Sequence, residues 1–569
     1  MSKKNLGSLF IFLFVAISIF FTLGKMGNEF NSFAFLGGDM AVYASIAAAQ
    51  DDPGLFANDP FLSNEKNIND YNMIFFPIIR ELKTVWGSYG TACLFLLPFF
   101  ILIHLIGYYV LGNSIFRNPW VGFYTSLIIS VPVSTYYDDW GIFLDALPRF
   151  LYQALIPFLL ALSIVRGRDP NWWPVILAGV GILNYVHPVS TPVWVVAIMI
   201  GLWVSANGVG LWKKTWMMAL AVLILVVILS PFLVNYFNST VDGASTSEDY
   251  DLVISVLKDR FFMMRDAGLI DVILNFFSSR MGLVFDFVWY LVIALAAGGV
   301  MYGAKKHESY ALIPSIRQIT GWMIGVFVAG AVIPVAEQAV FAKLREVPPE
   351  FELLRTFRFM LPLILLSAMC FLWIVKDKYQ NRKTTNRSAS RIPFNIFFMI
   401  LLIAWGVRGF SLRADFRAAV NQNMRCWARA ELVCPLSEKS GDLIGVLNTV
   451  RDETPVGSSI FSEGEILAIR YYAFRPLVYT YKDGAPLAYT DQQQLLNWSD
   501  QYTTMTKLSK FRNKPDRIKK YMNDLVEFAL TTEADYLLLD APYNPDLYYP
   551  TRLTLVYSNE NYSLYEITR

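Results

Sequence analysis

The chain alternates long apolar stretches with short polar gaps from its N-terminus to about residue 408. About eleven of these stretches approach the length that a helix needs to cross roughly 30 Å of hydrocarbon. The stretches lie near residues 6–24, 91–112, 119–136, 150–165, 172–186, 191–206, 215–236, 281–303, 319–341, 359–375 and 393–408. This pattern predicts an α-helical polytopic membrane protein with about eleven transmembrane helices. The stretch 172–186 is short and follows Pro170, which favours a broken or tilted helix.

Basic residues fall in every second gap and therefore predict an orientation. These alternate gaps form a series from the N-terminal residues Lys3 and Lys4 to the segment 376–391. Together they hold far more Lys and Arg than Asp and Glu. Short basic loops stay in the cytoplasm, so we expect a cytoplasmic N-terminus in the cell membrane. The first stretch lacks a small-x-small cleavage site and is expected to remain as an uncleaved helix. The regions expected outside the cytoplasm are 25–90, 137–149, 237–280 and everything after residue 409.

The C-terminal region changes character. Residues 409–569 contain strand-like runs such as "GSSIFSE" and "ADYLLLDA", which are separated by helical stretches. This alternation predicts a small α/β domain outside the cytoplasm. The predicted organisation is a membrane domain over residues 1–408, including the outer loops, and an α/β domain over residues 409–569.

Composition narrows the function classes. Only 17% of the residues are charged and the mean hydropathy is +0.40, whereas soluble domains carry about 25% charged residues. The net charge of +2 gives no indication of a nucleic-acid partner. With three histidines and no His/Cys cluster, the sequence indicates no metal, and we expect no cofactor. Cys426 and Cys434 lie in the outer region, where an oxidising compartment permits a disulfide, and paired and free thiols are equally compatible with the sequence.

The first outer loop carries the strongest candidate for chemistry. Gly37 and Gly38 precede Asp39, and the following "MAVYASIAAA" is typical of a helix. Asp39 is therefore either an N-cap that binds free amide groups or a carboxylate that accepts a proton from a hydroxyl nucleophile. Asp51 and Asp52 follow about three turns later, ahead of Pro53. They are candidates for substrate binding, and a role in forming the turn is the alternative.

Together these features resemble the GT-C superfamily of integral-membrane glycosyltransferases. The similarity rests on one helix, a long first loop reading "GGDMAVYASIAAAQDDPGLFANDPF", many spans, and an outer domain ending in "ADYLLLDAP" and "LTLVYSNENYSLYEI". The first loop is similar to that of uncharacterised bacterial members, and the resemblance implies a sugar donor on polyprenyl phosphate. The resemblance implies that a first-loop aspartate is the catalytic base or contacts a metal, and Asp39 is the matching position. Many members have adjacent acids here, whereas Met40 follows Asp39.

Two further outer segments contain candidate substrate-binding residues. The second loop, "STYYDDWGIFLDALPRF", carries Asp138, Asp139, Asp145 and Arg149 beside aromatic residues. Asp138 and Asp139 either hold sugar hydroxyls or form a hydrated turn within an interfacial aromatic belt. His187, in "NYVHPVSTP", is either a structural residue or a hydrogen-bond donor to a lipid phosphate or acceptor of a proton.

The turn before the stretch 359–375 carries two arginines. Arg355 and Arg358 are three residues apart, so on a helix their side chains point the same way. Paired guanidinium groups suit a lipid phosphate at the membrane surface, whereas interfacial snorkelling is the alternative.

These residues together predict a membrane glycosyltransferase. It moves a sugar, with inversion, from a polyprenyl-phosphate donor to an extracytoplasmic hydroxyl on a glycan, lipid or protein. Asp39 is the expected base, and a lipid-linked sugar and membrane lipids are the expected partners. The alternatives are a transporter or flippase of a lipid-linked solute, and a non-catalytic membrane scaffold whose outer domain binds a partner.

Overall fold

The fold is described from a computed structural model. It describes residues 3–26, 36, 38–69, 73–134, 139–240, 247–260, 268–270, 274, 312–345, 353–383, 402–403, 405–406, 409, 413–431, 438–512, 514, 517–540 and 552–569. The predicted span 281–303 lies outside these residues, and the predicted span 393–408 lies almost wholly outside them.

Seven helical segments in the described part of the chain are long and apolar enough to cross a membrane. Each coincides with a predicted span, and they are Asn5–Met26, Tyr89–Phe116, Pro148–Arg166, Pro188–Ser205, Leu211–Asn235, Ile313–Leu344 and Leu353–Ile374. The predicted spans 119–136 and 172–186 instead form twelve-residue helices, α6 (Pro119–Ser130) and α8 (Trp173–Asn184). At 1.5 Å per residue, each covers only about 18 Å, which is less than the hydrocarbon thickness.

The membrane bundle contains ten described helices. Besides α6 and α8 they are α1 (Lys3–Met26), α5 (Tyr89–Phe116), α7 (Pro148–Arg166), α9 (Thr191–Ser205), α10 (Leu211–Thr240), α14 (Ile313–Phe327), α15 (Ile333–Leu344) and α16 (Met360–Lys383). A π-helical segment, Val328–Val332, joins α14 to α15, and a 3-10 helix η7 (Leu353–Phe359) precedes α16. A Cβ atom at Gly325 would lie 2.3 Å from the Cα of Ala197, so glycine lets α9 and α14 touch through their backbones.

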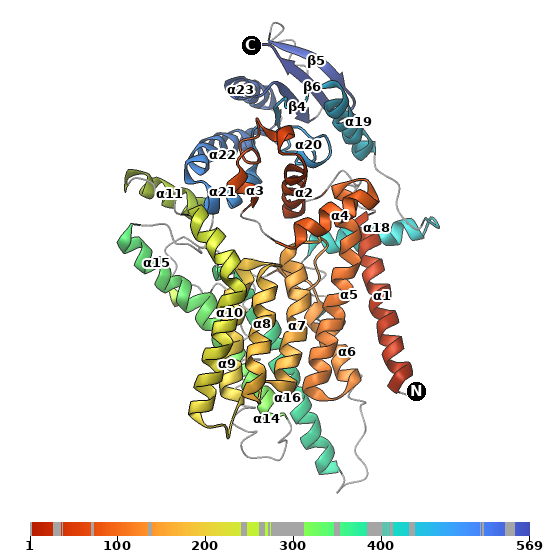
Figure 1. Ribbon diagram of the computed structural model, residues 1–569. Helices are drawn as coiled ribbons and strands as arrows, with labels where there is room; N and C mark the ends of the chain where they lie inside the picture. Colours follow the sequence, from red (N-terminus) through yellow and green to blue (C-terminus); the bar gives the residue numbers. More distant parts are fainter. Residues whose placement is uncertain are drawn as a thin grey trace.

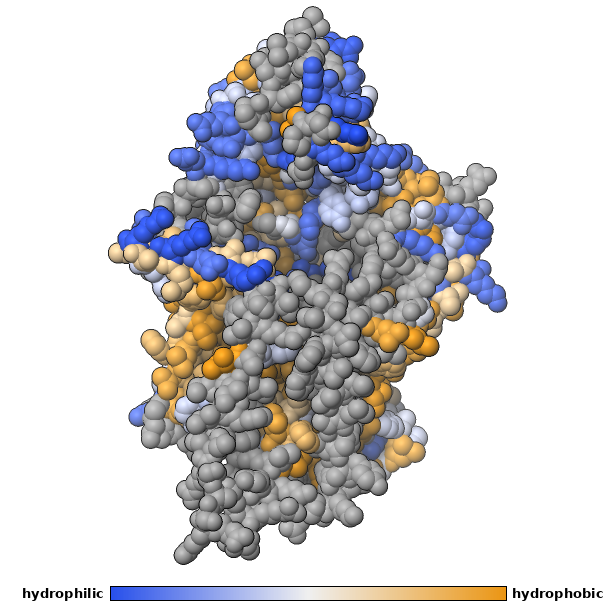
Figure 2. All heavy atoms as spheres, turned by 180° about the vertical axis from the view of Figure 1, so that it is seen from behind, coloured by the Kyte–Doolittle hydropathy of each residue, from blue (hydrophilic) through white to orange (hydrophobic). Residues whose placement is uncertain are grey.

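The N-terminus and the C-terminal domain lie at opposite ends of this bundle (Figure 1). Helices α2 (Gly38–Asp51), α3 (Glu65–Asn69) and α4 (Phe75–Trp86), with the 3-10 turn η1 (Pro53–Phe56), lie between the bundle and that domain. Helix α11 (Ser247–Arg260) follows α10 at the same end. On the face seen in Figure 2, the coloured surface of the bundle is mainly hydrophobic and that of the C-terminal domain mainly hydrophilic. The predicted fold class, a helical membrane protein with a C-terminal α/β domain, is confirmed, and the number of about eleven spans stays a prediction.

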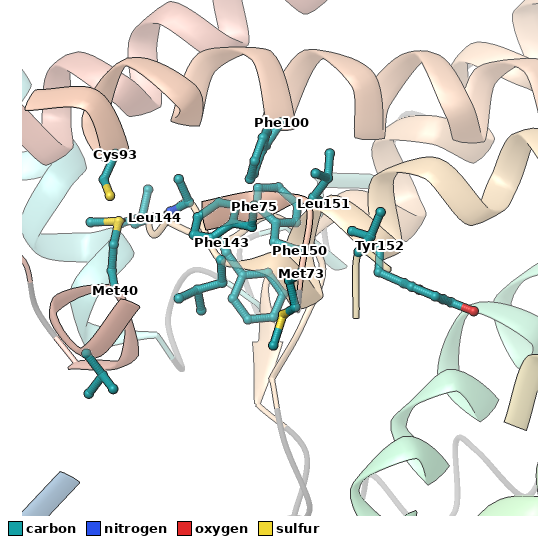
Figure 3. Packing of buried hydrophobic residues seen from close by; sticks show 14 of the residues in the cluster. Met40, Met73, Phe75, Cys93, Phe100, Phe143, Leu144, Phe150, Leu151 and Tyr152 are labelled. Atoms are coloured by element: carbon teal, nitrogen blue, oxygen red, sulfur yellow. Dashed lines mark hydrogen bonds between the residues drawn. The ribbon is translucent and has the colours of Figure 1, made fainter. Parts of the chain in front are cut away.

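An aromatic core anchors α2 and α4 to the bundle (Figure 3). The ring centres of Phe75 in α4 and Phe100 in α5 are 6.2 Å apart, and Phe100 lies 6.2 Å from Phe150 in α7. The Sδ atom of Met40 accepts a hydrogen bond from the Ala146 amide at 3.3 Å. Because these residues are almost fully buried, the first turn of α2 is fixed against the loop that leads into α7.

The C-terminal domain is built on a four-stranded sheet with the order β3-β4-β6-β5. Strand β3 (Ile460–Ser462) is parallel to β4 (Tyr536–Asp540), while β6 (Tyr562–Ile567) is antiparallel to both β4 and β5 (Leu553–Ser558). The helices are α19 (Glu438–Glu453), α20 (Ala468–Tyr471), α21 (Gly484–Thr490), α22 (Gln492–Arg512) and α23 (Ile518–Thr531), with a 3-10 turn η8 (Tyr481–Asp483). The strand-like run "PLVYTY" contributes only an isolated bridge between Leu477 and Ile460.

Helix α18 (Ala414–Trp427) packs on α1, although the predicted boundary places it in the α/β domain. The rings of Phe21 and Phe416 are 5.4 Å apart, and the Asn423 amide donates to the Phe20 carbonyl at 2.8 Å. Cys426 of this helix is disulfide-bonded, whereas Cys93 and Cys370 are free. Cys434 lies outside the described residues.

A buried charge triad joins the first outer loop to the C-terminal domain. Arg470 donates to Asp59 at 2.7 and 2.9 Å and to Asp483 at 2.7 and 2.8 Å. All three side chains are at most 5% exposed. Asp59 also accepts from the amides of Phe61, Leu62 and Leu477 at 2.9–3.0 Å. The triad therefore holds two segments together that are about 400 residues apart in the sequence.

Replacing Arg470 should separate these two segments. Arg470→Ala leaves two buried carboxylates without their cation, which should lower the free energy of unfolding by about 3–5 kcal/mol. Arg451→Ala removes an exposed ion pair with Asp452 and should change the free energy of unfolding by less than about 1 kcal/mol. Chemical unfolding, monitored by circular dichroism, measures this free energy for both variants. Equal effects of the two substitutions would contradict the assigned role of the triad.

Candidate active site around Asp39

Asp39 lies in the first turn of α2 and faces two cations from distant parts of the chain. Its Oδ1 accepts from Lys482 Nζ at 2.7 Å, and its Oδ2 lies 3.4 Å from Arg149 Nη2. Gly38 starts the helix with a φ of +56°, a left-handed conformation that glycine adopts without strain. The Asp39 side chain keeps 36% of its surface exposed. Asp39 therefore belongs to an accessible ion-pair cluster.

The cations come from three separate elements. Arg149 lies in the first turn of α7 with its guanidinium 5.4 Å from the centre of the Phe143 ring, and Lys482 belongs to η8 of the C-terminal domain. Arg355, in η7, is half-buried and acts on Asp39 through its charge. We call Asp39, Arg149, Arg355 and Lys482 the Asp39 cluster.

Three cations act on the Asp39 carboxylate. Burial by itself raises the pKa of the Asp39 carboxyl, but Arg149, Lys482 and Arg355 outweigh burial and hold this pKa well below its ordinary value. Asp39 is therefore ionised near pH 7. The N-terminal ends of α2 and α7 lie here as well and add partial positive charge. The cluster therefore suits a bound anion such as a phosphate group.

His187 borders the Asp39 cluster between α8 and the 3-10 turn η3 (Pro188–Ser190). Its Nδ1 lies 2.9 Å from Ser190 Oγ, and its ring centre is 6.4 Å from that of Tyr152. Burial, followed by the positive charges of Arg149 and Arg355, lowers the pKa of His187 to about 3. His187 is therefore a neutral imidazole near pH 7. It can exchange hydrogen bonds with a substrate but does not add a positive charge.

The two predicted arginines have different environments. Arg355 is half-buried and its charge acts on Asp39, whereas Arg358 is 2% exposed and its guanidinium lies 5.1 Å from the centre of the Phe359 ring. Both belong to the 3-10 helix η7 rather than to the α-helix that follows. We therefore assign Arg355 to the Asp39 cluster and describe Arg358 as a buried residue of the bundle.

Asp51 and Asp52 lie at the opposite end of α2 from Asp39. Twelve residues of helix at 1.5 Å each separate Asp51 from Asp39 by about 18 Å. The Asp51 carboxylate binds Arg80, accepts from the Tyr89 hydroxyl, and lies 3.8 Å from Lys83. Asp52 immediately precedes η1. The structure thus does not bring the two acids to the Asp39 cluster, and Asp51 ties α2 to α4 and α5.

The second-loop acids also have partners of their own. Asp139 lies in a short strand β2 (Asp139–Trp140) that pairs with β1 (Val133–Ser134), and its carboxylate is 3.0 Å from Arg413 Nη1. Asp145 is 2.9 Å from Lys25 Nζ. Asp138 lies outside the described residues. Asp139 and Asp145 therefore form ion pairs with residues near α18 and at the end of α1.

Sequence reasoning missed two members of the Asp39 cluster. Arg149 stood out only as part of an acidic loop, and Lys482 not at all, because it is 443 residues from Asp39. The short motif around Lys482, "YKDG", is typical of any polar turn. Only the docking of the C-terminal domain places this lysine at Asp39.

A mainly apolar groove lies among helices α9, α15 and η7 of the bundle. It encloses about 470 Å³ and is lined by residues of α9, α15 and η7, namely Pro192, Ile333, Ala336, Glu337, Val340, Phe341 and Leu353. Leu353 is two residues from Arg355, and Pro192 is five residues from His187. Among the described residues, no group of three His, Cys, Asp or Glu side chains could hold a metal ion.

Comparisons with known proteins add little to this geometry. No protein-family model matches the chain, and no curated protein matches it. Among solved structures, the chain matches the crystal structure of ArnT from Cupriavidus metallidurans bound to undecaprenyl phosphate. The identity is 14% and the TM-score 0.40, with 99% of this chain and 98% of that chain covered. A likeness at this level supports no conclusion about the site or activity of this chain.

The low pKa of His187 predicts that it stays neutral through the physiological range. The chain has three histidines, so the resonances lost in His187→Gln identify this residue in a spectrum of histidine-labelled protein. Those resonances should show neutral imidazole from pH 8 down to pH 5. An unfolded histidine takes up its proton near pH 6.5, so acidification below 6.5 should favour unfolding through this residue. A His187 titration midpoint between pH 6 and 7 would contradict the described environment.

The two arginines should respond differently to truncation. Arg358→Ala removes a large buried side chain and should lower the free energy of unfolding by about 2 kcal/mol or more. Arg355→Ala truncates a half-buried side chain and should lower the free energy of unfolding by clearly less. Thermal unfolding of both variants in the same detergent measures the difference, and a larger loss for Arg355→Ala would reverse the assignment.

Proposed function

We propose that this chain is a GT-C-type membrane glycosyltransferase. It transfers a sugar from a polyprenyl-phosphate donor to an acceptor hydroxyl at the membrane face that carries the C-terminal domain. The observation that carries the proposal is the Asp39 cluster, in which cations from three elements act on one carboxylate. It is supported by the mainly apolar groove, whose lining residue Leu353 is two residues from Arg355. Such a site suits a ligand with an anionic head and a hydrocarbon tail.

The donor would bind with its phosphate at the cations and its tail in the groove. Arg149, Arg355 and Lys482 supply charge-assisted hydrogen bonds, and arginine can hold two phosphate oxygens at once. The tail would lie among Ile333, Val340 and their neighbours, where it exchanges one apolar environment for another. The neutral His187 would donate a hydrogen bond to the phosphate or to the sugar.

Asp39 would serve as the base in the transfer. The acceptor oxygen attacks the anomeric carbon while its proton passes to the Asp39 carboxylate. The bond between this carbon and the phosphate oxygen breaks, and its electron pair leaves with the polyprenyl phosphate. One displacement inverts the anomeric configuration. The arginines and Lys482 stabilise the charge that develops on the leaving phosphate.

The proposed location of the reaction rests on the charge pattern of the sequence. The basic gaps predict a cytoplasmic N-terminal end of the bundle, and the C-terminal domain lies at the opposite end (Figure 1). The Asp39 cluster would therefore face the extracytoplasmic side of the cell membrane. The acceptor would be a component of the cell envelope.

Removing the Asp39 carboxylate should slow transfer strongly. Asp39→Asn should lower kcat by about 10²–10⁴-fold, because it eliminates a general base. Asp524→Asn removes a carboxylate from an exposed pair with Lys520 on α23 and should retain full activity. Mass spectrometry of lipid-linked sugars and envelope glycans, with each variant as the sole copy, measures the product. Equal product from Asp39→Asn and the unmodified protein would reject Asp39 as the base.

A further inference from the structure

The C-terminal domain holds the backbone of Lys482 firmly, while its side chain is partly exposed and extends to Asp39. Asp483, the next residue, lies in the buried triad with Arg470, and the amide of Tyr481 donates to Glu465 at 2.8 Å. The Lys482 side chain is itself 32% exposed and ends in an ammonium group on a four-carbon chain. Such a group can change partners without movement of the domain.

Asp39 and an arriving phosphate would compete for the same cations. Lys482 binds Asp39 Oδ1 at 2.7 Å and Arg149 lies 3.4 Å from Oδ2, so both carboxylate oxygens face a cation. A carboxylate held in this way is a weak base, because its lone pairs are already engaged. A phosphate at the same position would need these ammonium and guanidinium donors for itself.

We propose that Lys482 exchanges Asp39 for the donor phosphate, so that the carboxylate becomes available as a base only when donor is bound. This inference rests on the proposed function and adds a regulatory role for the C-terminal domain. In the free protein, the Lys482 ammonium group forms an ion pair with the Asp39 carboxylate. On donor binding the ammonium turns to the phosphate, and the Asp39 carboxylate is released toward the acceptor hydroxyl.

The charges around Asp39 predict how this exchange changes its proton affinity. Arg149 of α7, Arg355 of η7 and Lys482 of η8 lower the Asp39 pKa in the free protein, and His187 stays neutral. A bound phosphate brings negative charge and engages those cations, so the Asp39 pKa should rise. In a transfer assay, the acidic limb of kcat should therefore lie at higher pH than the acidic limb of kcat/KM, which reports the free enzyme.

A binding measurement tests the exchange without relying on catalysis. The full-length protein is placed in nanodiscs of phosphatidylcholine and titrated with undecaprenyl phosphate, and separately with inorganic phosphate. Asp39→Asn removes the competing carboxylate and should tighten binding of undecaprenyl phosphate by about tenfold, on the scale of one charge-assisted hydrogen bond. Lys482→Ala should weaken binding, and the double variant should lose the gain seen with Asp39→Asn alone. Tightening with both ligands would assign the effect to the phosphate, and tightening with the lipid alone would assign it to phosphate presented on a tail.

The matched controls are Asp524→Asn and Lys520→Ala, which change the same charges in the exposed pair on α23 and should leave binding unchanged. If the unmodified protein binds undecaprenyl phosphate but Asp39→Asn does not bind it more tightly, the exchange is wrong while the proposed function stands. If the unmodified protein binds neither ligand, both the exchange and the polyprenyl-phosphate donor are wrong. Coincident acidic limbs of kcat and kcat/KM would overturn the exchange as well.

Discussion

The arrangement of the site depends on one buried charge interaction, the contact of Arg470 with Asp59 and Asp483. Moving three charged groups out of water is costly, and the mutual attraction of the charges offsets this cost only with good geometry. Here the guanidinium meets both carboxylates with two hydrogen bonds each, and three backbone amides bind the remaining lone pairs of Asp59. Such a directional interaction fixes one relative position of the first outer loop and the C-terminal domain. Lys482 precedes Asp483, so the same contact sets where this lysine can reach.

The second constraint is the positive charge of Arg149, Arg355 and Lys482, which acts on Asp39. These cations hold the Asp39 pKa down, so the carboxylate is a poor base in the free protein. A phosphate bound at the same cations would weaken their effect on the carboxylate and make it a better base. The groove between α9 and α15 is mainly apolar and would suit the hydrocarbon tail of such a ligand.

The C-terminal end of α2, which carries Asp51, has a structural role. Asp51 binds Arg80, Lys83 and Tyr89 and so connects α2 with α4 and α5. This connection fixes the axis of α2, while Met40 fixes its first turn, so both ends of the helix are held. Asp39 and Asp51 are both aspartates of the first outer loop, but they lie about three turns apart on α2 and therefore have different partners.

The sequence by itself determined the membrane-spanning character, the positions of seven spans and the presence of a C-terminal α/β domain. Long apolar runs and period-two strands are local properties, so they can be read without knowing the fold. Asp39 could be singled out from the glycines that precede a helical run and from its match to a first-loop aspartate, and Arg355 from its three-residue spacing to Arg358. The tertiary structure alone decided that the charge of Arg355 acts on Asp39, that Asp139 binds Arg413, and that Lys482 completes the cluster. Those contacts join residues separated by up to 443 positions, and no local pattern encodes the packing that brings them together.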